Sequence, residues 1–436
     1  MYGTKIDIID GIRTFISISK KSRLFFQSDS DFRRDRKLNF ENTVALILRL
    51  LKKSLNVELY EFFDEVEKDQ TCTKSAFTQQ RKKIDYSFFK YLSKFLVMHY
   101  YEVVGKEIKY WKGFRLLAVD GSRLNLVNKP DLLEEFGVQV NQASEFVMSL
   151  VMNCYDVLNN ISIESEILPI KTSELSVAYK WSDNLFKSTD LVLYDRGFGS
   201  FSLFWMHSKS NEVLLPYAMR LKVSFNNKIK EFVKSRKTTS IVTLNVTDKA
   251  IKSLGKIGYY LTRKETVKVR LIRVVLPTGE IEVIATNLYD SQMYPSKIFK
   301  ELYFMRWGVE VEFGAHKNIY QIEQQSGYSV NTIKQDFYTN IFISNLHNIF
   351  MKIDYDNNRT KYKYKTNRNV TSAILRDKII DIILNTEKES SEIVNDLNRY
   401  FLLYKEPVRP DRKAPRKIRA IVKGKYRTVT NFKRAV

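Results

Sequence analysis

The stretch YFMRWGVEVEFGAHKN, residues 303 to 318, decides how the rest of this chain is interpreted. Its residue pattern predicts one helix, on which Tyr303, Arg306, Glu310 and Lys317 follow the spacing Y-x2-R-x3-E-x6-K. At about 100° per residue, these four side chains fall within roughly 60° of one helix face. A carboxylate, two cations and an aromatic ring on one face suit a metal-dependent enzyme that grips a phosphodiester. The alternative is a solvated helix with chance pairs of opposite charge at i and i+4.

A second stripe on the same predicted helix is apolar and is expected to pack in the core. Its members are Ile298, Leu302, Met305, Val309 and Phe313. Trp307 is either a core residue or a base-stacking wedge, and we favour the core. Glu312 competes with Glu310 for the carboxylate role, but it lies roughly 160° away around the helix, off the polar stripe. Gly308 and Gly314 are helix breakers, which a close approach of DNA or of a neighbouring strand would explain.

Two aspartates follow short apolar runs upstream of this helix. Asp120 follows the run 114–119 and opens Asp-Gly-Ser, and Asp195 follows the run 191–194 and opens Asp-Arg-Gly. Both runs have the length of a strand, and the residues after them are typical of turns. A carboxylate at the end of a buried strand lies where open α/β sheets bind their ligands. A single Asp-Gly is usually only a turn, but two strand-end aspartates and a helical glutamate form a more specific combination.

Taken together, these residues resemble the bacterial DDE transposases of the "IS-four" insertion-sequence family. The resemblance covers about residues 70 to 350 and includes DGS at 120–122, YDRGF at 194–198, RLK at 220–222, TNLYD at 286–290 and LYFMRWGVEVEF at 302–313. It implies an α/β fold with a ribonuclease-H-like mixed-sheet core, interrupted by a β-rich insertion before the glutamate. It implies that Asp120, Asp195 and Glu310 are the catalytic residues and the metal ligands. The residues that it assigns to DNA binding are Tyr303, Arg306, Lys317, Arg220 and Lys222.

The chemistry that the resemblance implies is phosphoryl transfer on DNA, in which the protein supplies position and charge. Two Mg²⁺ ions about 3.5–4 Å apart, for which Mn²⁺ could substitute, would activate the attacking oxygen and stabilise the leaving oxygen. Asp120 would bind both ions, and Asp195 and Glu310 would each complete one of them. By the same resemblance, water cleaves the first strand and the freed 3′-hydroxyl attacks the opposite strand to form a hairpin, with a flipped base.

Two other functions compete with a cut-and-paste transposase. A stand-alone nuclease or junction resolvase would use the same chemistry, but basic arms at both ends of the chain argue against it. A domesticated DNA-binding or regulatory protein without activity would be expected to lack at least one acid, and all three are present.

The charge of the chain favours a polyanionic partner. The 436 residues include 72 Lys and Arg against 49 Asp and Glu, a formal net charge of +23. Nucleic acid is the expected partner and a membrane surface the competing one. We find no run of eighteen apolar residues and no signal peptide, so neither a spanning segment nor secretion is supported, and we expect a cytoplasmic protein. The resemblance implies a bacterial protein that is nucleoid-associated when active and a homodimer on DNA. Cys72 and Cys154 are far apart, and the four histidines form no zinc motif.

Composition divides the chain into five segments. Residues 1–105 are predicted to be a helical DNA-binding domain, 106–204 and 293–352 the two parts of the core, 205–292 the β-rich insertion, and 353–436 a basic C-terminal region. A hairpin is predicted around a turn at 158–160. The segment 359–368 alternates cations with tyrosines, and the tail 411–436, with ten Lys or Arg against one Asp, is expected to be an extended arm that orders on DNA.

The N-terminal segment contains three more specific predictions. Asn42 or Thr43 is expected to cap a helix that starts near residue 44, and a second helix is expected over 59–68. After a turn at 71–73, a basic helix would offer Lys74, Arg81, Lys82 and Lys83 to phosphates. A helix-turn-helix reader of transposon ends and a plain helical bundle both remain open.

Overall fold

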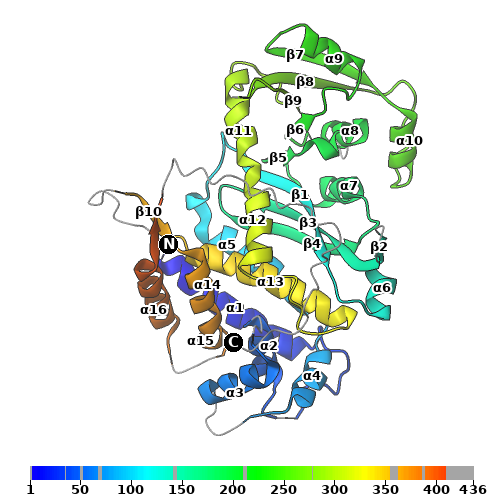
Figure 1. The fold of residues 1–436 in the computed structure, drawn as a ribbon. Coiled ribbons are helices and arrows are strands. Elements are labelled where there is room, and N and C mark those ends of the chain that lie inside the picture. Colours follow the sequence, from blue (N-terminus) through cyan, green and yellow to red (C-terminus); the bar gives the residue numbers. More distant parts are fainter. Residues whose placement is uncertain are drawn as a thin grey trace. The chain divides into compact units, whose positions relative to one another are not determined.

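The computed structural model describes residues 2–34, 36–49, 53–66, 71–140, 145–209, 214–276, 278–353, 362–384 and 388–408 (Figure 1). The chain forms two compact units. The first comprises Met1–Ile108, Arg123–Ser149 and Phe313–Val436, and the second comprises Lys109–Ser122 and Leu150–Glu312. The basic tail 411–436 and residues 359–361 lie outside the described residues, so the predictions for them stay open.

The first unit is helical, as predicted for the N-terminal segment. Its main helices are α1 (Tyr2–Ser22), α2 (Phe40–Leu48), α3 (Leu55–Val66), α4 (Lys74–Lys82), α5 (Ser87–Val104), α6 (Pro130–Phe136), α13 (Val330–Phe350), α14 (Arg368–Asp377), α15 (Ile379–Ile383) and α16 (Ser390–Leu403). The helix α13 is the centre of the unit, because every side chain from Phe337 to Phe350 is buried. It packs against α5 and α2. A short 3-10 turn (Gly105–Glu107), the strand β2 (Val138–Val140) and the two-stranded sheet of β10 (Tyr364–Thr366) and β11 (Lys405–Pro407) complete it.

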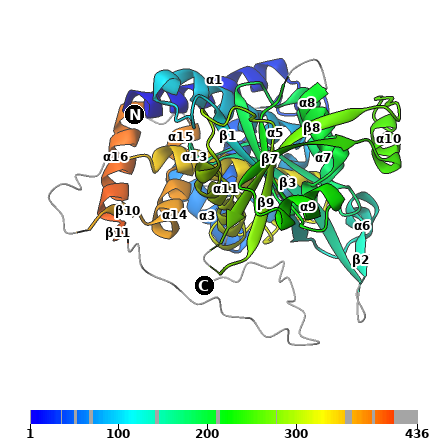
Figure 2. The same ribbon diagram turned by 90° about the horizontal axis from the view of Figure 1, so that it is seen from above.

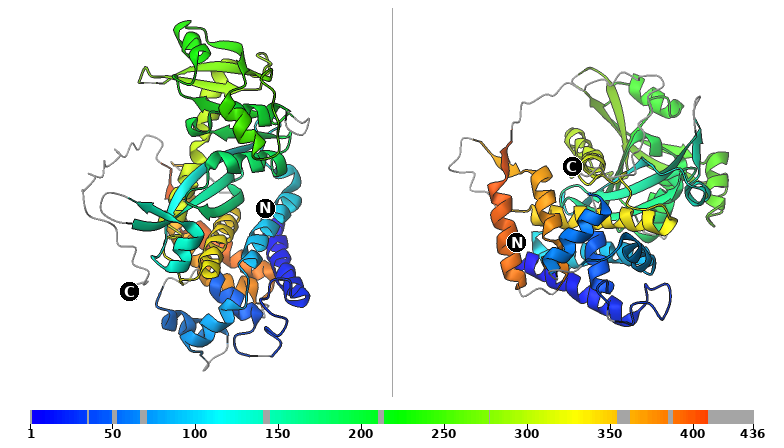
Figure 3. Two further views of the ribbon diagram at one scale, coloured as in Figure 1. Left: turned by 90° about the vertical axis from the view of Figure 1, so that its right-hand side faces the viewer. Right: turned by 60° about the horizontal axis from the view of Figure 1, so that its bottom comes forward.

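Segments from the two ends of the chain pack together in this unit. Figure 2 shows the start of α1 beside α16, and Figure 3 shows the blue N-terminal helices beside the orange C-terminal ones. The Lys5 ammonium, 2% exposed, donates to the Phe350 carbonyl at 3.0 Å and to Asn398 Oδ1 at 2.7 Å. Arg13 donates to the carbonyls of Asp381 and Ile382. The helical unit is therefore assembled from sequence segments more than 300 residues apart.

The helices predicted individually in the N-terminal segment can be compared with the structure. The helix α3 and the basic helix α4, capped by Thr73, are confirmed. The predicted cap of α2 is wrong, because Asn39 is the N-cap and its side chain accepts a hydrogen bond from the Asn42 backbone N–H.

Arg81, which was expected to be available for phosphate, is only 4% exposed. It donates to Gln335 Oε1 at 2.7 Å and to Asp336 Oδ1 at 2.7 Å, both on α13. Its guanidinium therefore ties α4 to α13, and the expectation that it contacts DNA is wrong.

The second unit is built on a mixed sheet. Its strands are β1 (Arg115–Asn125), β3 (Glu145–Asp156), β4 (Ile161–Pro169), β5 (Asp190–Tyr194), β6 (Tyr217–Leu221), β7 (Thr239–Asn245), β8 (Thr266–Val275) and β9 (Ile281–Thr286). They follow the order β3-β1-β5-β6-β9-β8-β7, with β4 paired to β3; the unit boundary falls within β1 and β3. β1, β5 and β6 are parallel, whereas β6, β9, β8 and β7 are antiparallel. All five residues of β5 are buried, as expected for a central parallel strand. The expected mixed α/β class is confirmed.

The helices of this unit are α7 (Glu174–Asn184), α8 (Phe201–Lys209), α9 (Asn227–Lys234), α10 (Asp248–Gly255), α11 (Phe299–Met305) and α12 (Trp307–Asn318), with 3-10 turns at Arg196–Phe198 and Ser296–Ile298. The boundary between the units falls within α12. In the described part of the chain, no helix is both long and apolar enough to cross a membrane.

Three sequence expectations can be compared directly with these elements. The hairpin is confirmed as β3 and β4, and Asn160 in its turn has φ of 57°. The turn predicted at Asp120 is wrong, because β1 continues through it to Asn125. The single helix predicted over 303–318 is divided into α11 and α12, with a turn at Arg306. The segment 205–292 contributes four strands to the same sheet as the core, and the proposed domain limits stay a prediction.

Candidate active site

Three polar residues form a row across the parallel part of the sheet. Val119 of β1 is in register with Tyr194 of β5, and Tyr194 is in register with Met219 of β6. The next residue along each strand is Asp120, Asp195 and Arg220, respectively. Neighbouring strands lie about 4.8 Å apart, so the register brings the three side chains to adjacent positions. Asp195 directly follows β5, as expected from the sequence.

Asp195 is the most heavily hydrogen-bonded member of the row. Its Oδ1 accepts from Arg220 Nη2 at 2.7 Å, from Arg220 Nε at 3.0 Å and from the Tyr303 hydroxyl at 3.2 Å. Burial alone would raise the pKa of Asp195, but the Arg196 backbone N–H and the Arg220 and Arg306 cations hold the pKa below its usual value. Asp195 is therefore an ionised carboxylate at neutral pH.

Arg306, at the turn between α11 and α12, connects the other two acids. Its Nη2 donates to Glu310 Oε1 at 2.6 Å, and its Nη1 lies 3.9 Å from Asp120 Oδ2. The side chain is only 2% exposed, and among the described residues its Nε and Nη1 have no hydrogen-bond partner. Burial of an unpaired guanidinium costs free energy, so Glu310 and Asp120 stabilise Arg306 in its buried position.

Asp120 lies in a less polar setting than Asp195. Burial raises the pKa of Asp120 to about 6; Arg306 and the Gly121 backbone N–H oppose the rise, and Glu310 and Glu174 add to it. Glu174 begins α7 and approaches so closely that a Cβ on Gly121 would lie 2.4 Å from its Oε1. Gly121 thus leaves room for the Glu174 side chain and does not form a turn.

Two acidic residues near the row were missed in the sequence. Glu174 influences Asp120, and Glu282 of β9 accepts a hydrogen bond from Arg220 Nη1. Neither belongs to a recognisable motif, because their proximity comes from the packing of α7 and the pairing of β6 with β9.

The signature residues are more buried than the sequence suggested. Tyr303 is 5% exposed, and its hydroxyl faces Asp195 and the Tyr194 carbonyl. In this arrangement Tyr303 and Arg306 orient carboxylates, and their predicted contact with DNA stays a prediction. Lys317 belongs to the first unit, where its Nζ donates to the Arg123 carbonyl at 2.8 Å.

The remaining helix predictions have mixed outcomes. Leu302 and Val309 are fully buried as expected, whereas Trp307 is 41% exposed, so its placement in the core is wrong. A Cβ on Gly308 would lie 3.1 Å from Val157 Cγ1, so the close approach of the β3–β4 hairpin accounts for this glycine. Glu312 is 1% exposed, and its Oε2 accepts a hydrogen bond from the Tyr155 hydroxyl at 3.5 Å. Glu310, by contrast, is partly exposed.

Two cavities adjoin the row on the side of Arg220. One, of about 910 Å³, is lined by Arg220, Tyr303, Phe304 and Trp307, by Lys297 and Lys300, and by three acids, Glu280, Glu282 and Glu301. The other, of about 750 Å³, is lined by Arg196, Arg220, Lys222 and Lys230 and by Glu280 and Glu282. Lys222 is exposed, as a residue that contacts DNA would be, although its role stays a prediction. Cations beside exposed aromatic rings suit a nucleic-acid backbone and its bases.

The acids have the chemistry of a magnesium site but not its arrangement. Asp120, Asp195 and Glu310 offer only oxygen ligands, and their side chains are 22%, 31% and 36% exposed. Among the residues that the structure describes, no three His, Cys, Asp or Glu side chains are grouped to hold a metal ion as they stand. The Arg306 guanidinium contacts two of the acids and occupies Glu310 Oε1.

Replacing Tyr303 with Phe tests whether its hydroxyl orients Asp195. A hydrogen bond to a charged group contributes about 1.5 kcal/mol or more, which corresponds to roughly a tenfold change in rate. We therefore expect about tenfold slower DNA cleavage with unchanged DNA affinity. Tyr289→Phe is the matched control, because that hydroxyl donates to the Lys268 carbonyl instead. Equal rates for Tyr303→Phe and the wild type would contradict the role of the hydroxyl.

Comparison with known families identifies the kind of protein that carries this site. The family model described as "Transposase DDE domain" matches residues 111–346, more than half of the chain. The chain belongs to this family of transposase DDE domains, and the matched residues include Asp120, Asp195 and Glu310. Family membership implies a polynucleotidyl transferase.

One solved structure with which the chain can be compared is a piggyBac transposase synaptic complex with hairpin DNA. The two share 11% sequence identity and a TM-score of 0.40, over 92% of this chain and 79% of that chain. A search of curated proteins finds no match.

Proposed function

We propose that this protein is a DNA transposase of the IS-four type, which cleaves DNA at the ends of its insertion sequence and joins those ends to target DNA. The observation that carries the proposal is the alignment of Asp120 and Asp195 on adjacent parallel strands, with Arg306 joining Asp120 to Glu310. Three acids within reach of one cationic group form a site with the ligands that phosphoryl transfer needs. The resemblance of the signature helix to the IS-four family supplies the more specific assignment.

Each residue of the site has a distinct task in this proposal. Asp195, held ionised by Arg220, and Asp120, on the neighbouring strand, present oxygens to the cation site. Bound divalent cations, Mg²⁺ or Mn²⁺, would activate the attacking oxygen and stabilise the leaving oxygen. Glu310 would complete the ligand set by turning its carboxylate away from Arg306. Arg306 would then be free to face a phosphate oxygen, a pairing for which its planar guanidinium is well suited.

DNA would reach these acids along the two cavities, whose cations lie among Glu280, Glu282 and Glu301. Arg196, Lys222 and Lys230 line one side and Lys297 and Lys300 the other, so backbone phosphates can be neutralised on both. The exposed rings of Phe304 and Trp307 would contact bases or sugars there. The hairpin route and a dimer on DNA belong to the proposal through the family resemblance.

The experiment that tests the proposal uses a plasmid carrying the gene with its natural flanking DNA. Purified protein and Mg²⁺ are expected to produce strand breaks with 3′-hydroxyl ends at matched inverted repeats on both sides. Hairpin ends, seen on a denaturing gel as a product of doubled length, would support the hairpin route. Cleavage at unrelated positions would indicate a nuclease, and binding without cleavage would indicate a regulatory protein.

The raised pKa of Asp120 predicts how cleavage depends on pH. Because protonation removes its negative charge, metal binding and cleavage should fall as pH drops below about 6, by about tenfold per pH unit for one proton. Arg306 lowers the pKa of Asp120, so Arg306→Gln should move the midpoint to higher pH. The measurement is the single-turnover cleavage rate between pH 5 and pH 8 at fixed Mg²⁺. A midpoint that does not move in Arg306→Gln would contradict this coupling.

A further inference from the structure

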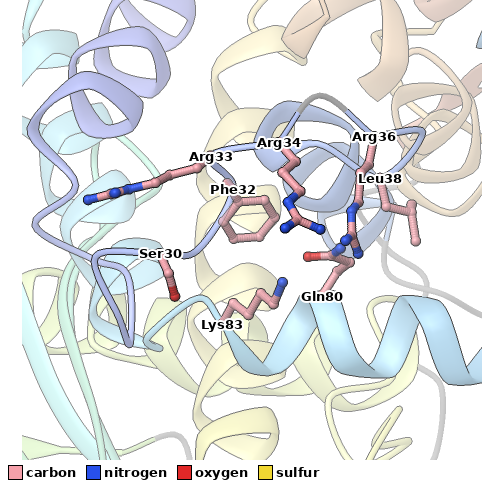
Figure 4. Close-up of a pocket in the computed structure, with 8 residues that line it drawn as sticks. All are labelled: Ser30, Phe32, Arg33, Arg34, Arg36, Leu38, Gln80 and Lys83. Atoms are coloured by element: carbon pink, nitrogen blue, oxygen red, sulfur yellow. The ribbon is translucent and has the colours of Figure 1, made fainter.

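A second basic site lies in the helical unit, apart from the acids. A cavity of about 370 Å³ is formed between the segment that precedes α2 and the C-terminal end of α4 (Figure 4). Its lining includes Phe32, Arg33, Arg34, Arg36, Gln80 and Lys83. No Asp or Glu is among the lining residues that the structure describes. Four cations around one cavity produce a strongly positive local potential.

Three of the cationic groups converge. Figure 4 shows the side chains of Arg34, Arg36 and Lys83 reaching toward one space beside the Gln80 amide, whereas Arg33 points away. Within the described part of the chain, neither Arg34 nor Arg36 has a hydrogen bond or an ion pair. Lys83 forms one long ion pair, in which its Nζ lies 3.8 Å from Asp31 Oδ1. Like charges that converge repel one another, and among the described residues only Asp31 offsets the charge of this group. An anion between the cations would lower that repulsion.

Gln80 provides an independent sign that a ligand belongs here. The residue is 8% exposed, and its Oε1 is buried without a hydrogen-bond partner among the described residues. Because the oxygen and nitrogen of an amide are assigned from their partners, the amide can equally turn its N–H₂ into the cavity. A buried amide with an unused polar atom is costly, and an anion beside it would satisfy the N–H₂ group.

The cavity is built on a fixed frame. The Gln27 backbone N–H donates to the Lys83 carbonyl, and the Asp85 N–H donates to the Phe25 carbonyl, both at 2.9 Å. Phe32 packs against Phe26 and Phe40, with ring centroids 5.1 and 5.7 Å away. Phe32 has φ of 52°, a conformation uncommon for a bulky residue. These contacts hold Phe32 and the backbone at Gln27 and Lys83 in fixed positions beside the cavity.

We infer that this cavity binds a backbone phosphate of duplex DNA; the inference rests on the proposed function, which makes DNA the substrate. Guanidinium groups match phosphate oxygens in geometry, and an ammonium adds a point charge. The Phe32 ring is packed against two other rings and faces Lys83 at 5.7 Å, so base stacking on it is not favoured. The site would therefore fix the position of DNA on the helical unit without reading its sequence.

The test compares two double variants of equal net charge. Arg34→Gln with Arg36→Gln removes the converging guanidinium groups. Arg263→Gln with Arg399→Gln removes two exposed arginines that pair with Asp248 and Asp396. Duplex DNA affinity is measured by fluorescence anisotropy at several salt concentrations, and thermal unfolding of all proteins checks that they fold alike.

The expected result is that the DNA affinity of Arg34→Gln/Arg36→Gln depends less on salt, whereas that of Arg263→Gln/Arg399→Gln depends on salt as in the wild type. Each phosphate-bound cation contributes about 0.9 to the slope of log affinity against log salt, so the slope should fall by nearly 2. Raising the salt from roughly 50 to 200 mM should therefore weaken DNA binding by the wild type about tenfold more than DNA binding by the variant. A slope that is unchanged, or that falls equally in both variants, would overturn the inference while the wild type still binds DNA. Failure of the wild type to bind DNA would defeat the proposed function itself.

A second arm excludes a small phosphorylated ligand. Calorimetric titration with inorganic phosphate and with a mononucleotide should show equally weak binding to the wild type and to Arg34→Gln/Arg36→Gln. Tight binding of either ligand that is lost in this variant, with the DNA salt slope unchanged, would overturn the assignment to DNA. A scan of duplexes with single neutral methylphosphonates should find one or two adjacent positions where the wild type loses affinity and the variant does not. A scan in which both proteins respond alike at every position would also overturn the inference.

Discussion

Asp120→Asn, Asp195→Asn and Glu310→Gln should each abolish Mg²⁺-dependent cleavage while DNA binding persists. The loss should be at least about 10²- to 10³-fold, the range seen when a preorganised group that stabilises transition-state charge is removed. DNA affinity should be equal or higher, because each substitution removes a negative charge and no cation. The measurement is a single-turnover cleavage rate with saturating DNA, beside an affinity measured in Ca²⁺.

Two carboxylates provide matched controls for this experiment. Glu312→Gln changes the buried neighbour that contacts Tyr155, and Asp248→Asn changes an exposed residue paired with Arg263. Both should retain most of the cleavage activity. An equal loss in Glu310→Gln and Glu312→Gln, with both proteins folded, would show that the third catalytic acid has been assigned wrongly.

Arg81→Ala should be the most destabilising substitution in the basic helix α4. Arg81 is 4% exposed and donates to Gln335 and Asp336 on α13, so its removal takes a donor from the buried Gln335 Oε1 and breaks the ion pair with Asp336. Removing one partner of a buried ion pair costs about 3–5 kcal/mol in the free energy of unfolding. The measurement is urea denaturation followed by circular dichroism.

Lys82→Ala is the control for this prediction, because Lys82 is the exposed neighbour in the same helix. A surface substitution of this kind usually changes the free energy of unfolding by less than about 0.5 kcal/mol. If Arg81→Ala were as stable as Lys82→Ala but bound DNA more weakly, Arg81 would be a DNA contact and its structural role would be disproved.

The features that were predictable from the sequence are those with local signals. The buried strand before Asp195 is a short apolar run with a turn after it, and the β3–β4 hairpin has polar turn residues between two apolar runs. The basic helix α4 after the turn at 71–73 has the same kind of local signal. For each of these, neighbouring residues alone determine the conformation.

The features that were missed depend on distant segments. Asp-Gly at Asp120 is a good turn signal, but β1 continues beside β3 to Asn125, beyond its last pair with β5 at Val119. Gly121 leaves room for the side chain of Glu174, 53 residues later. Arg81 has the appearance of a solvated cation, but its acceptors come from residues 254 and 255 positions away. Helix periodicity placed Arg306 on a face with Glu310 and could not show that this face is buried against the acids of β1 and β5.

The most direct test of the central claim, that Asp120, Asp195 and Glu310 form one cation-dependent cleavage site, is the anomalous scattering of Mn²⁺ in crystals of the protein bound to transposon-end DNA. We expect two Mn²⁺ peaks about 3.5–4 Å apart, with oxygens of all three acids among their ligands and Glu310 no longer bonded to Arg306. Mn²⁺ bound at other residues, with Glu310 still on Arg306 in crystals whose DNA is cleaved, would contradict this claim.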